Sequence, residues 1–575
     1  MLAVTPAHAA EEQVHASSLR AGALLALATL ICLLPFSGRA FHVDDPLFIW
    51  TARQIVKHPL DPYGFSLNWG ITRMRMAEVT QNPPLAGYYG ALIGRVAGWS
   101  ERGWHLGFLV PALVVILGTY RLALHFTRLP LVAAVATLST PGFLVSSTSV
   151  MSDTLMLALW ILAAIFWLEG LEPVRPPYLV ASAVLMAACA LTKYFGASLI
   201  LLLLVYSVAR QRRLGKYAWY TLIPIFILVG YQLWTKAVYG HGLLFGAAEF
   251  ARIHREQSTK SVKAAMGLSF AGGCMLPALT LAPFLWSRKR IFWVSVVAAL
   301  AGLSIGTGWV SLGISPQARA IRFALRQHWP SASVQLALCI AGGIFVLALV
   351  YADFRKRKDA ESLFLMLWVL GTFIFAAFLN WTLNARSILP LIPAAGILLA
   401  RRLQDAGSLS EPPFRFKLIL ALALSGGVSL WITSADSALA NSARTAAGLI
   451  HERAQKEAGT VWFEGHWGFQ YYMELYGAHA VDFENSTLRP GDFVVIPENN
   501  AVIPKMLPEQ VATLEVVELP LVQPITTIRR DMGAGFYSTY FGPLPFAVGK
   551  VPPERYYLFR LISKVSASQL TPPTR

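Results

Sequence analysis

The sequence contains few cysteines and few charged residues for its length. Of its 575 residues, four are cysteine and 14% are Asp, Glu, Lys or Arg. All four cysteines lie in apolar runs, so the sequence predicts neither a disulfide framework nor a cysteine-based zinc site. The nucleotide-binding loop Gly-x-x-x-x-Gly-Lys-Ser/Thr and the His-Glu-x-x-His motif are absent as well. These absences exclude a disulfide-rich secreted protein and do not support soluble-nucleotide chemistry.

What the chain has in abundance is apolar residues. Hydrophobic residues make up 55% of the sequence, and the mean hydropathy is +0.52, which is typical of an integral membrane protein. The net charge is +17, but residues 436–575 carry 14 acidic and 12 basic residues, so the positive excess lies upstream. There it forms short clusters between apolar runs. This pattern indicates cytoplasmic loops, so no nucleic-acid partner is expected.

Thirteen apolar segments are candidates for membrane spans, because a bilayer core of about 30 Å needs roughly 20 residues of helix. They predict a polytopic all-α membrane domain over residues 1–434. The segments are 19–37, 105–121, 130–147, 153–170, 177–192, 196–210, 218–236, 265–286, 291–312, 333–352, 361–380, 387–401 and 417–434.

The basic clusters indicate the orientation. With the N-terminus in the cytoplasm, every strong cluster, such as 210–216 and 355–358, falls on the cytoplasmic side. No apolar h-region precedes the Ala-His-Ala near the N-terminus, so the first apolar run is expected to remain as an anchor. An odd number of spans then places four segments on the opposite, outer face: 38–104, 237–264, 313–332 and 435–575.

Two of the outer segments have a predicted structure of their own. Residues 38–104 contain the helix starts Asp45-Pro46 and Asn82-Pro83-Pro84, which predict amphipathic helices on the membrane surface. Residues 435–575 predict a small periplasmic α/β domain, with helices over 436–457 and around 469–475. Its strand-like runs are 461–463, 480–483, 493–496 and 513–517.

Acidic residues stand at the outer ends of apolar spans. Asp44 and Asp45 follow the first span, and Asp153 begins the fourth. Asp45 alone would cap the surface helix, which leaves Asp44 without a structural role. Asp153 would either take part in the reaction or have only a structural role, as an acid in the first helical turn, which the helix dipole favours. In the second case Ser152 would be the cap. All three carboxylates are candidates for a site, because ionisable residues at membrane depth are commonly functional.

Isolated cations lie on the same side. Lys193 and Arg386 stand next to apolar runs at positions where the positive-inside rule requires no cation. Each would either bind a phosphate that arrives within the membrane or act as a snorkelling anchor. Arg252, Arg255 and Arg322 lie in two outer loops, where they would either contact an anionic substrate or remain solvated.

The tail contains residue types that zinc accepts as ligands. Glu464, His466 and Glu474 are close in sequence and invite a metal interpretation. The simpler interpretation of Gly465-His466-Trp467-Gly468 is a turn from a strand to a helix. No cofactor is therefore predicted from the tail.

Five features over residues 20–430 resemble a known class in their order. They are an acidic pair after the first span, Pro-Pro-Leu-x-x-Tyr-Tyr in the first outer loop, an Asp that begins the fourth span, Leu-Thr-Lys-Tyr, and Ala-Arg-Ser-Ile-Leu-Pro-Leu-Ile-Pro-Ala. The chain resembles the GT-C membrane glycosyltransferases that use polyprenyl-phosphate sugars. This group, glycosyltransferase family 39 and its relatives, contains protein O-mannosyltransferases and lipid A aminoarabinose transferases.

The resemblance implies roles for particular residues. It implies that Asp44 is the catalytic carboxylate, with Asp45 as its acidic partner and Asp153 as a second carboxylate of the site. It implies that Lys193 and Arg386 lie near the lipid phosphate of the donor. Asn82 is a candidate substrate-binding residue, but the two branches of the class have Lys or His at this position, so neither branch's substrate is implied.

The expected reaction is transfer of a sugar from a polyprenyl-phosphate donor to a hydroxyl acceptor at a bacterial inner membrane. One carboxylate would accept the proton of the acceptor, and cations or a divalent metal would stabilise the leaving phosphate. Direct displacement would invert the anomeric centre. Two alternatives are a lipid or polysaccharide transporter and a non-catalytic assembly subunit. The absence of an internal repeat argues against the transporter. The sugar, the acceptor, which would be a lipid, a glycan or a protein, and the metal requirement are not predicted.

Overall fold

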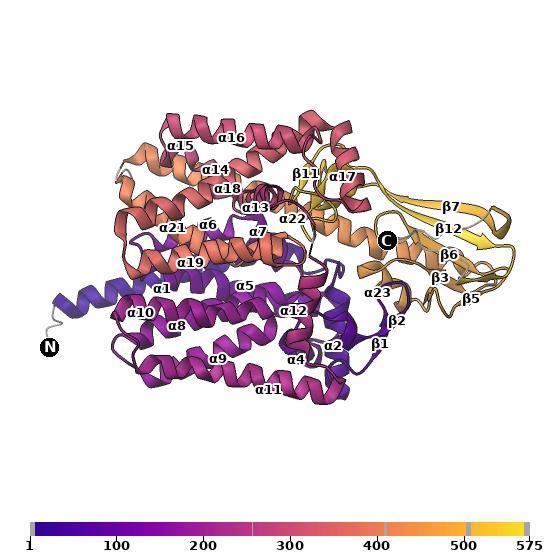
Figure 1. The fold of residues 1–575 in the computed structure, drawn as a ribbon, viewed down its shortest axis with the longest axis horizontal. Coiled ribbons are helices and arrows are strands. Elements are labelled where there is room, and N and C mark those ends of the chain that lie inside the picture. Colours follow the sequence, from indigo (N-terminus) through magenta and orange to yellow (C-terminus); the bar gives the residue numbers. More distant parts are fainter. Residues whose placement is uncertain (1–5, 256, 408–410, 502–507, 568–575) are drawn as a thin grey trace.

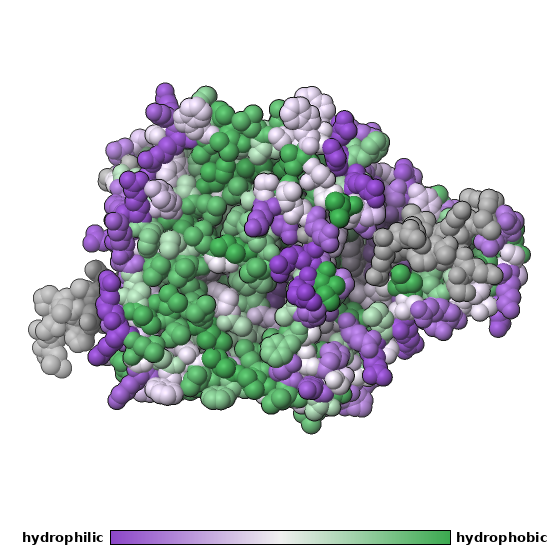
Figure 2. All heavy atoms as spheres, in the orientation of Figure 1, coloured by the Kyte–Doolittle hydropathy of each residue, from purple (hydrophilic) through white to green (hydrophobic). Residues whose placement is uncertain are grey.

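The computed structural model describes residues 6–255, 257–407, 411–501 and 508–567. Helices form a bundle whose members run side by side, and the C-terminal strands extend from one end of it (Figure 1). A band of hydrophobic residues crosses the face of the bundle, and hydrophilic residues gather at its ends (Figure 2). The molecule is a multi-pass membrane protein, as its composition predicts.

Each of the thirteen predicted spans contains helix. Among the described residues, nine helices are long and apolar enough to cross a membrane without a bend. In four of the nine, α1, α10, α11 and α19, the apolar span includes an adjoining helical turn. The nine are α1 (Pro6–Leu33), α5 (Glu101–Ala123), α8 (Ser152–Leu171), α10 (Ser198–Gln211), α11 (Leu222–Tyr239), α16 (Arg288–Gly306), α18 (Trp329–Arg357), α19 (Ala360–Ile374) and α22 (Pro412–Ala454).

The other four predicted spans are short or broken, so the described residues contain nine or ten membrane-crossing helices by this criterion instead of thirteen. Proline explains most of the breaks, because it lacks an N–H and clashes with the preceding turn. Pro141, for example, begins the second member of a pair that meets at 63°. The pieces are α6 (Pro130–Leu138), α7 (Pro141–Ser147), α9 (Pro176–Thr192), α13 (Lys260–Cys274), α14 (Leu276–Thr280), α15 (Ala282–Leu285), α20 (Ala385–Ile388) and α21 (Leu391–Ala406).

The loop between α1 and α5 contains both helices that the sequence predicts there. Glycine allows them to pack closely, because a Cβ added at Gly87 would lie 2.7 Å from the Thr51 side chain. A short antiparallel hairpin and a single helical turn connect the two helices. The elements are α2 (Asp45–Lys57), β1 (Ser66–Asn68), β2 (Arg73–Arg75), α3 (Met76–Val79) and α4 (Leu85–Ala97).

The C-terminal portion contains a mixed sheet of five strands in the order β4-β3-β6-β12-β7. Strand β3 is parallel to both of its neighbours, whereas β12 is antiparallel to β6 and β7. The four predicted strand-like runs overlap or adjoin β3, β4, β6 and β7; β12 was not predicted. The bounds are β3 (Val461–Phe463), α23 (Trp467–Leu475), β4 (His479–Ala480), β6 (Phe493–Pro497), β7 (Val511–Leu519) and β12 (Glu554–Leu561).

The C-terminal portion is connected to the bundle at more than one place. Helix α22 has 43 residues and runs without a break across the predicted boundary at 434/435. Further along the chain, β11 (Ala547–Val548) returns to α18, where the Gln335 side chain bonds both the N–H and the carbonyl of Val548, at 2.7 and 3.0 Å. Part of the segment between β7 and β12 therefore lies against the membrane helices (Figure 1).

Candidate functional site

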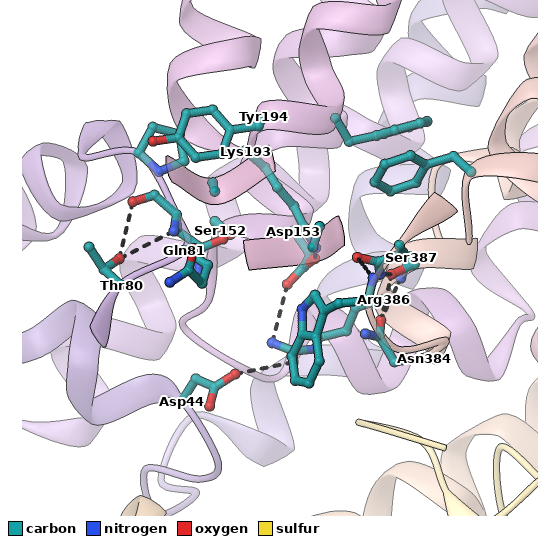
Figure 3. A pocket seen from close by; sticks show the side chains of 18 of the residues that line it. Asp44, Thr80, Gln81, Ser152, Asp153, Lys193, Tyr194, Asn384, Arg386 and Ser387 are labelled. Atoms are coloured by element: carbon teal, nitrogen blue, oxygen red, sulfur yellow. Dashed lines mark hydrogen bonds and ion pairs between the residues drawn. The ribbon is translucent and has the colours of Figure 1, made fainter. Parts of the chain in front are cut away.

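Four charged residues expected at the site line one cavity of about 960 Å³ (Figure 3). Asp44 lies in the turn before α2, Asp153 in the first turn of α8, Lys193 in the break after α9, and Arg386 in α20. Asn82 lines the same cavity from the loop between α1 and α5. The fold thus brings together side chains that are far apart in the sequence.

Arg386 is the centre of the charge cluster. Its Nη2 donates to Asp44 Oδ2 at 3.1 Å, and its Nη1 lies 3.8 Å from Asp153 Oδ2. The Nζ of Lys193 donates to Asp153 Oδ1. Two acids and two bases therefore alternate, and their formal charges cancel. Because Lys193 and Arg386 share Asp153, an anion that enters the cavity could contact both cations.

Two polar atoms of this cluster make no hydrogen bond. In the part of the chain that the structure describes, Asp153 Oδ2 and Arg386 Nε are buried and have no hydrogen-bond partner. Such atoms are uncommon, because an unmade hydrogen bond of a buried group costs about 1–3 kcal/mol. A ligand with an acceptor oxygen would satisfy the Arg386 N–H.

Asp44 and Asp45 have different surroundings. The Asp44 side chain is 29% exposed and lines the cavity. Asp45 is fully buried, does not line it, and accepts the backbone N–H groups of His42 at 2.9 Å and Val150 at 3.0 Å. Burial raises the pKa of Asp45 to about 7, and Arg39 opposes this shift. Through the bond to Val150, Asp45 connects the first loop to the residues before α8.

Both capping predictions made from the sequence are wrong. The N-cap of α2 is Asp44 and not Asp45, and its side chain makes no capping hydrogen bond. The N-cap of α8 is Met151 and not Ser152, again without a capping side chain. Asp153 follows in the first turn, where the helix dipole favours a negative charge. Neither the Asp44 nor the Asp153 side chain makes a capping hydrogen bond, so both carboxylates are available to Arg386.

The cavity wall contains two strained backbone positions. Val43 has φ 46° and Trp467 has φ 66°, and both residues line the cavity. A bulky residue in the left-handed region costs about 1–3 kcal/mol and persists only where the surroundings enforce it. The other two described non-glycine residues with positive φ, Arg212 and Lys358, end helices, where this conformation is common. The strain at Val43 directly precedes Asp44.

The C-terminal portion supplies an aromatic wall of the cavity, which the sequence did not reveal. The Arg386 guanidinium lies 5.5 Å from the centre of the Tyr537 ring. The hydroxyl of Tyr537 donates to Asp436 at 2.8 Å, and Asp436 forms a fully buried ion pair with Arg39 at 2.6 Å. In the sequence, the only local pattern that marks this wall is the aromatic-rich run between Gly535 and Gly542. The wall consists of Trp467, Tyr537, Tyr540 and Phe541.

An apolar arm extends the cavity between α10 and α19. Leu201, Leu202 and Val205 line it from α10, and Leu367 lines it from α19. Leu201 is 65% exposed, so the arm reaches the outer surface of the bundle. A Cβ added at Gly371, which also lines the arm, would meet no atom within 4 Å. The cavity thus joins a charged end to an apolar channel.

Three predicted substrate-binding residues do not line this cavity. Arg252, on α12 (Leu243–Ile253), is exposed and pairs with Glu249 at 2.6 Å. Arg322 donates to the carbonyl of Gly308 at 2.6 Å and so holds a loop. Arg255 is also absent from the cavity wall. The face of α12 that does line the cavity carries Leu244, Ala247, Ala248, Phe250 and Ala251.

The residues of the site do not fit a resident divalent metal. Among the described residues, no group of three or more His, Cys, Asp or Glu side chains is placed to hold one. Asp44 and Asp153, the two carboxylates of the cavity, are already paired with cations. In the tail, His466 precedes α23 as its N-cap, which agrees with the predicted turn, and burial lowers its pKa to about 4.

Comparison with known proteins gives one family match. Residues 81–234 match the model of the dolichyl-phosphate-mannose-protein mannosyltransferases. This confirms the resemblance to the GT-C class over a segment that contains Asn82, Asp153 and Lys193. The sequence has no match among curated proteins.

Two solved structures show a distant likeness. ArnT from Cupriavidus metallidurans, bound to undecaprenyl phosphate, has a TM-score of 0.39 and 15% identity, and the match covers 84% of this chain and 93% of ArnT. The oligosaccharyltransferase AglB from Archaeoglobus fulgidus, in complex with an inhibitory peptide and a dolichol-phosphate, has a TM-score of 0.46 and 12% identity. That match covers 81% of this chain and 64% of AglB.

Proposed function

We propose that the chain is a membrane glycosyltransferase that moves a sugar from a polyprenyl-phosphate donor to a hydroxyl group of an acceptor. The observation that carries the proposal is the cavity in which two carboxylates and two cations adjoin an apolar arm. A donor of this kind has the same two parts, a charged phosphate and a long apolar chain. The family match over 81–234 supports the same reaction.

Asp44 is the carboxylate best placed to act as the general base. Its side chain is 29% exposed, whereas that of Asp153 is 2% exposed and is held by Lys193. In the proposed step, Asp44 accepts the proton of the acceptor hydroxyl, and the hydroxyl oxygen bonds to the anomeric carbon. The bond from that carbon to the phosphate oxygen breaks, and the phosphate leaves with the electron pair. A single displacement inverts the anomeric centre.

Arg386 and Lys193 would stabilise the leaving phosphate. Both are held in place before the donor arrives, Arg386 by Asp44 and the Tyr537 ring and Lys193 by Asp153. Preorganised cations need little rearrangement as charge develops on the leaving group. Binding of the phosphate to Arg386 would also loosen its contact with Asp44 and leave that carboxylate free to take a proton.

The proposed location is a bacterial inner membrane, with the cavity and the C-terminal portion on the periplasmic side. The positive-inside rule supports it, because the basic runs at 210–216 and 355–358 lie at helix ends far from the C-terminal portion (Figure 1). Reporter fusions after residue 214 and after residue 459 should give opposite signals. Equal signals would overturn this orientation.

The general-base role predicts the behaviour of Asp44→Asn. The amide keeps the size of the side chain but cannot take a proton, so transfer from a labelled donor should fall by about 10²–10⁴. Donor binding should persist, because the change removes a negative charge beside Arg386.

The matched control is Glu78→Gln, an exposed residue of the same outer loop that does not line the cavity. It should transfer sugar at nearly the normal rate. Near-normal transfer by Asp44→Asn would contradict the proposed base, and persistent lipid movement without sugar transfer in the wild-type protein would favour a transporter.

The donor path predicts the effect of a side chain at Gly371. Gly371→Leu should fold, because the added Cβ meets open space and Leu favours a helix over Gly by roughly 0.8 kcal/mol. It should fill the apolar arm and raise the KM for a full-length polyprenyl-phosphate sugar at least several-fold. A donor with a short prenyl chain should be affected less.

Gly230→Leu is the control for this change. Gly230 lies in α11, is exposed, has nothing within 4 Å of an added Cβ, and does not line the cavity. Its KM for the full-length donor should stay at the wild-type value. The proposed path is wrong if Gly371→Leu and Gly230→Leu give the same kinetics.

A further inference from the structure

We propose that the chain binds an anionic glycerophospholipid in a second cavity, at the end of the bundle far from the C-terminal portion. This cavity has a volume of about 950 Å³ and lies between α16, α18 and α21. It shares no residue with the cavity around Arg386, so the inference does not depend on the proposed reaction. Five cations and no acidic residue line it: Lys289, Arg290, Arg355, Lys356 and Arg402.

The positive charge of this basic cavity is not balanced by the protein. Within the described ranges, Lys356 pairs with Asp405 at 2.9 Å, but no ion pair involves Lys289, Arg290, Arg355 or Arg402. Asp353, a buried carboxylate of α18, is paired with Arg357 and Arg401, neither of which lines the cavity. Topology alone requires basic residues on one side of the membrane. It does not require four unneutralised ones around a single cavity.

Aromatic side chains hold three of these cations in place. The Trp286 ring lies 4.8 Å from the guanidinium of Arg402 and 5.8 Å from that of Arg290. Arg355 donates to the Tyr351 hydroxyl at 2.9 Å. Fixed cations lose less entropy when they bind an anion than flexible ones do. The arrangement therefore favours binding of a headgroup over loose attraction of counterions.

Trp286 supplies a second sign of a missing ligand. The residue is 9% exposed, and its buried indole N–H has no acceptor in the part of the chain that the structure describes. Tryptophan N–H groups usually find a partner when they are buried. A phosphate or ester oxygen of a lipid bound in the cavity would provide that acceptor.

The rest of the cavity is apolar, which indicates a lipid instead of a free anion. Trp293, Val294 and Phe345 line it below the cations. Beyond them, α16 presents exposed Val297 and Leu300, along which an acyl chain can continue. Basic pockets between transmembrane helices are known to hold anionic headgroups. In the proposed complex, the lipid phosphate contacts the cations and the acyl chains contact the apolar residues of the cavity and of α16.

The test uses the full-length protein in detergent with equal amounts of phosphatidylglycerol and phosphatidylcholine that have identical acyl chains. Native mass spectrometry should show that the wild-type protein retains phosphatidylglycerol in preference. Arg290→Gln with Arg355→Gln should bind it roughly 30-fold more weakly, the loss expected for two headgroup cations. The control, Arg212→Gln with Arg213→Gln, removes the same charge from exposed residues outside the cavity and should retain the wild-type preference.

Each other outcome contradicts the proposal. Equal retention of the two lipids by the wild-type protein would mean that the headgroup charge is not recognised. Equal losses in the two double variants would mean that net charge alone attracts the lipid. Complete displacement by inorganic phosphate would assign the cavity to a free anion, and unchanged retention by Arg290→Gln with Arg355→Gln would place the lipid elsewhere.

Discussion

The site depends on one arginine that is shared by two carboxylates. A guanidinium stays protonated at any relevant pH, so Arg386 needs negative partners where it is largely shielded from water. Asp44 and Asp153 are these partners, and Lys193 also pairs with Asp153. The two most buried groups, Arg386 and Asp153, each have two oppositely charged partners, one of which is the other member of this pair. This mutual dependence holds the four side chains in place without a bound ligand.

A second buried pair supports the first. Arg39 and Asp436 are fully shielded and lie 2.6 Å apart, and Asp436 also accepts the Tyr537 hydroxyl. Breaking such a pair by removing one partner typically costs about 3–5 kcal/mol. The pair connects the end of the first span, α22 and the C-terminal segment, and the Tyr537 ring lies over Arg386. The C-terminal portion therefore forms one wall of the cavity as well as the five-stranded sheet.

Hydropathy predicted the helices because membrane burial imposes a strong and local constraint on composition. The positions of Asp44, Asp153, Lys193 and Arg386 at the outer ends of spans also indicated one site, since helix ends on one side of a bilayer must lie near a common plane. The breaks at Pro141 and in 387–401 were missed because a length criterion does not detect a bend within an apolar run. The hydrogen bond between Asp45 and Val150 and the contact of Tyr537 with Arg386 join distant segments, and no local pattern encodes them.

The proposed reaction depends above all on the binding of the donor phosphate by Lys193 and Arg386. The most direct measurement is the affinity for a polyprenyl phosphate compared with the uncharged polyprenol of the same length. In Lys193→Met and in Arg386→Met, the preference for the phosphate should fall by about 1.5–3 kcal/mol, or roughly 10- to 150-fold, because a charge-assisted contact is lost. Binding of the polyprenol should not change, and Lys236→Met, an exposed cation outside the cavity, should keep the full preference. The same preference for the phosphate in both site variants as in the wild-type protein would contradict the account.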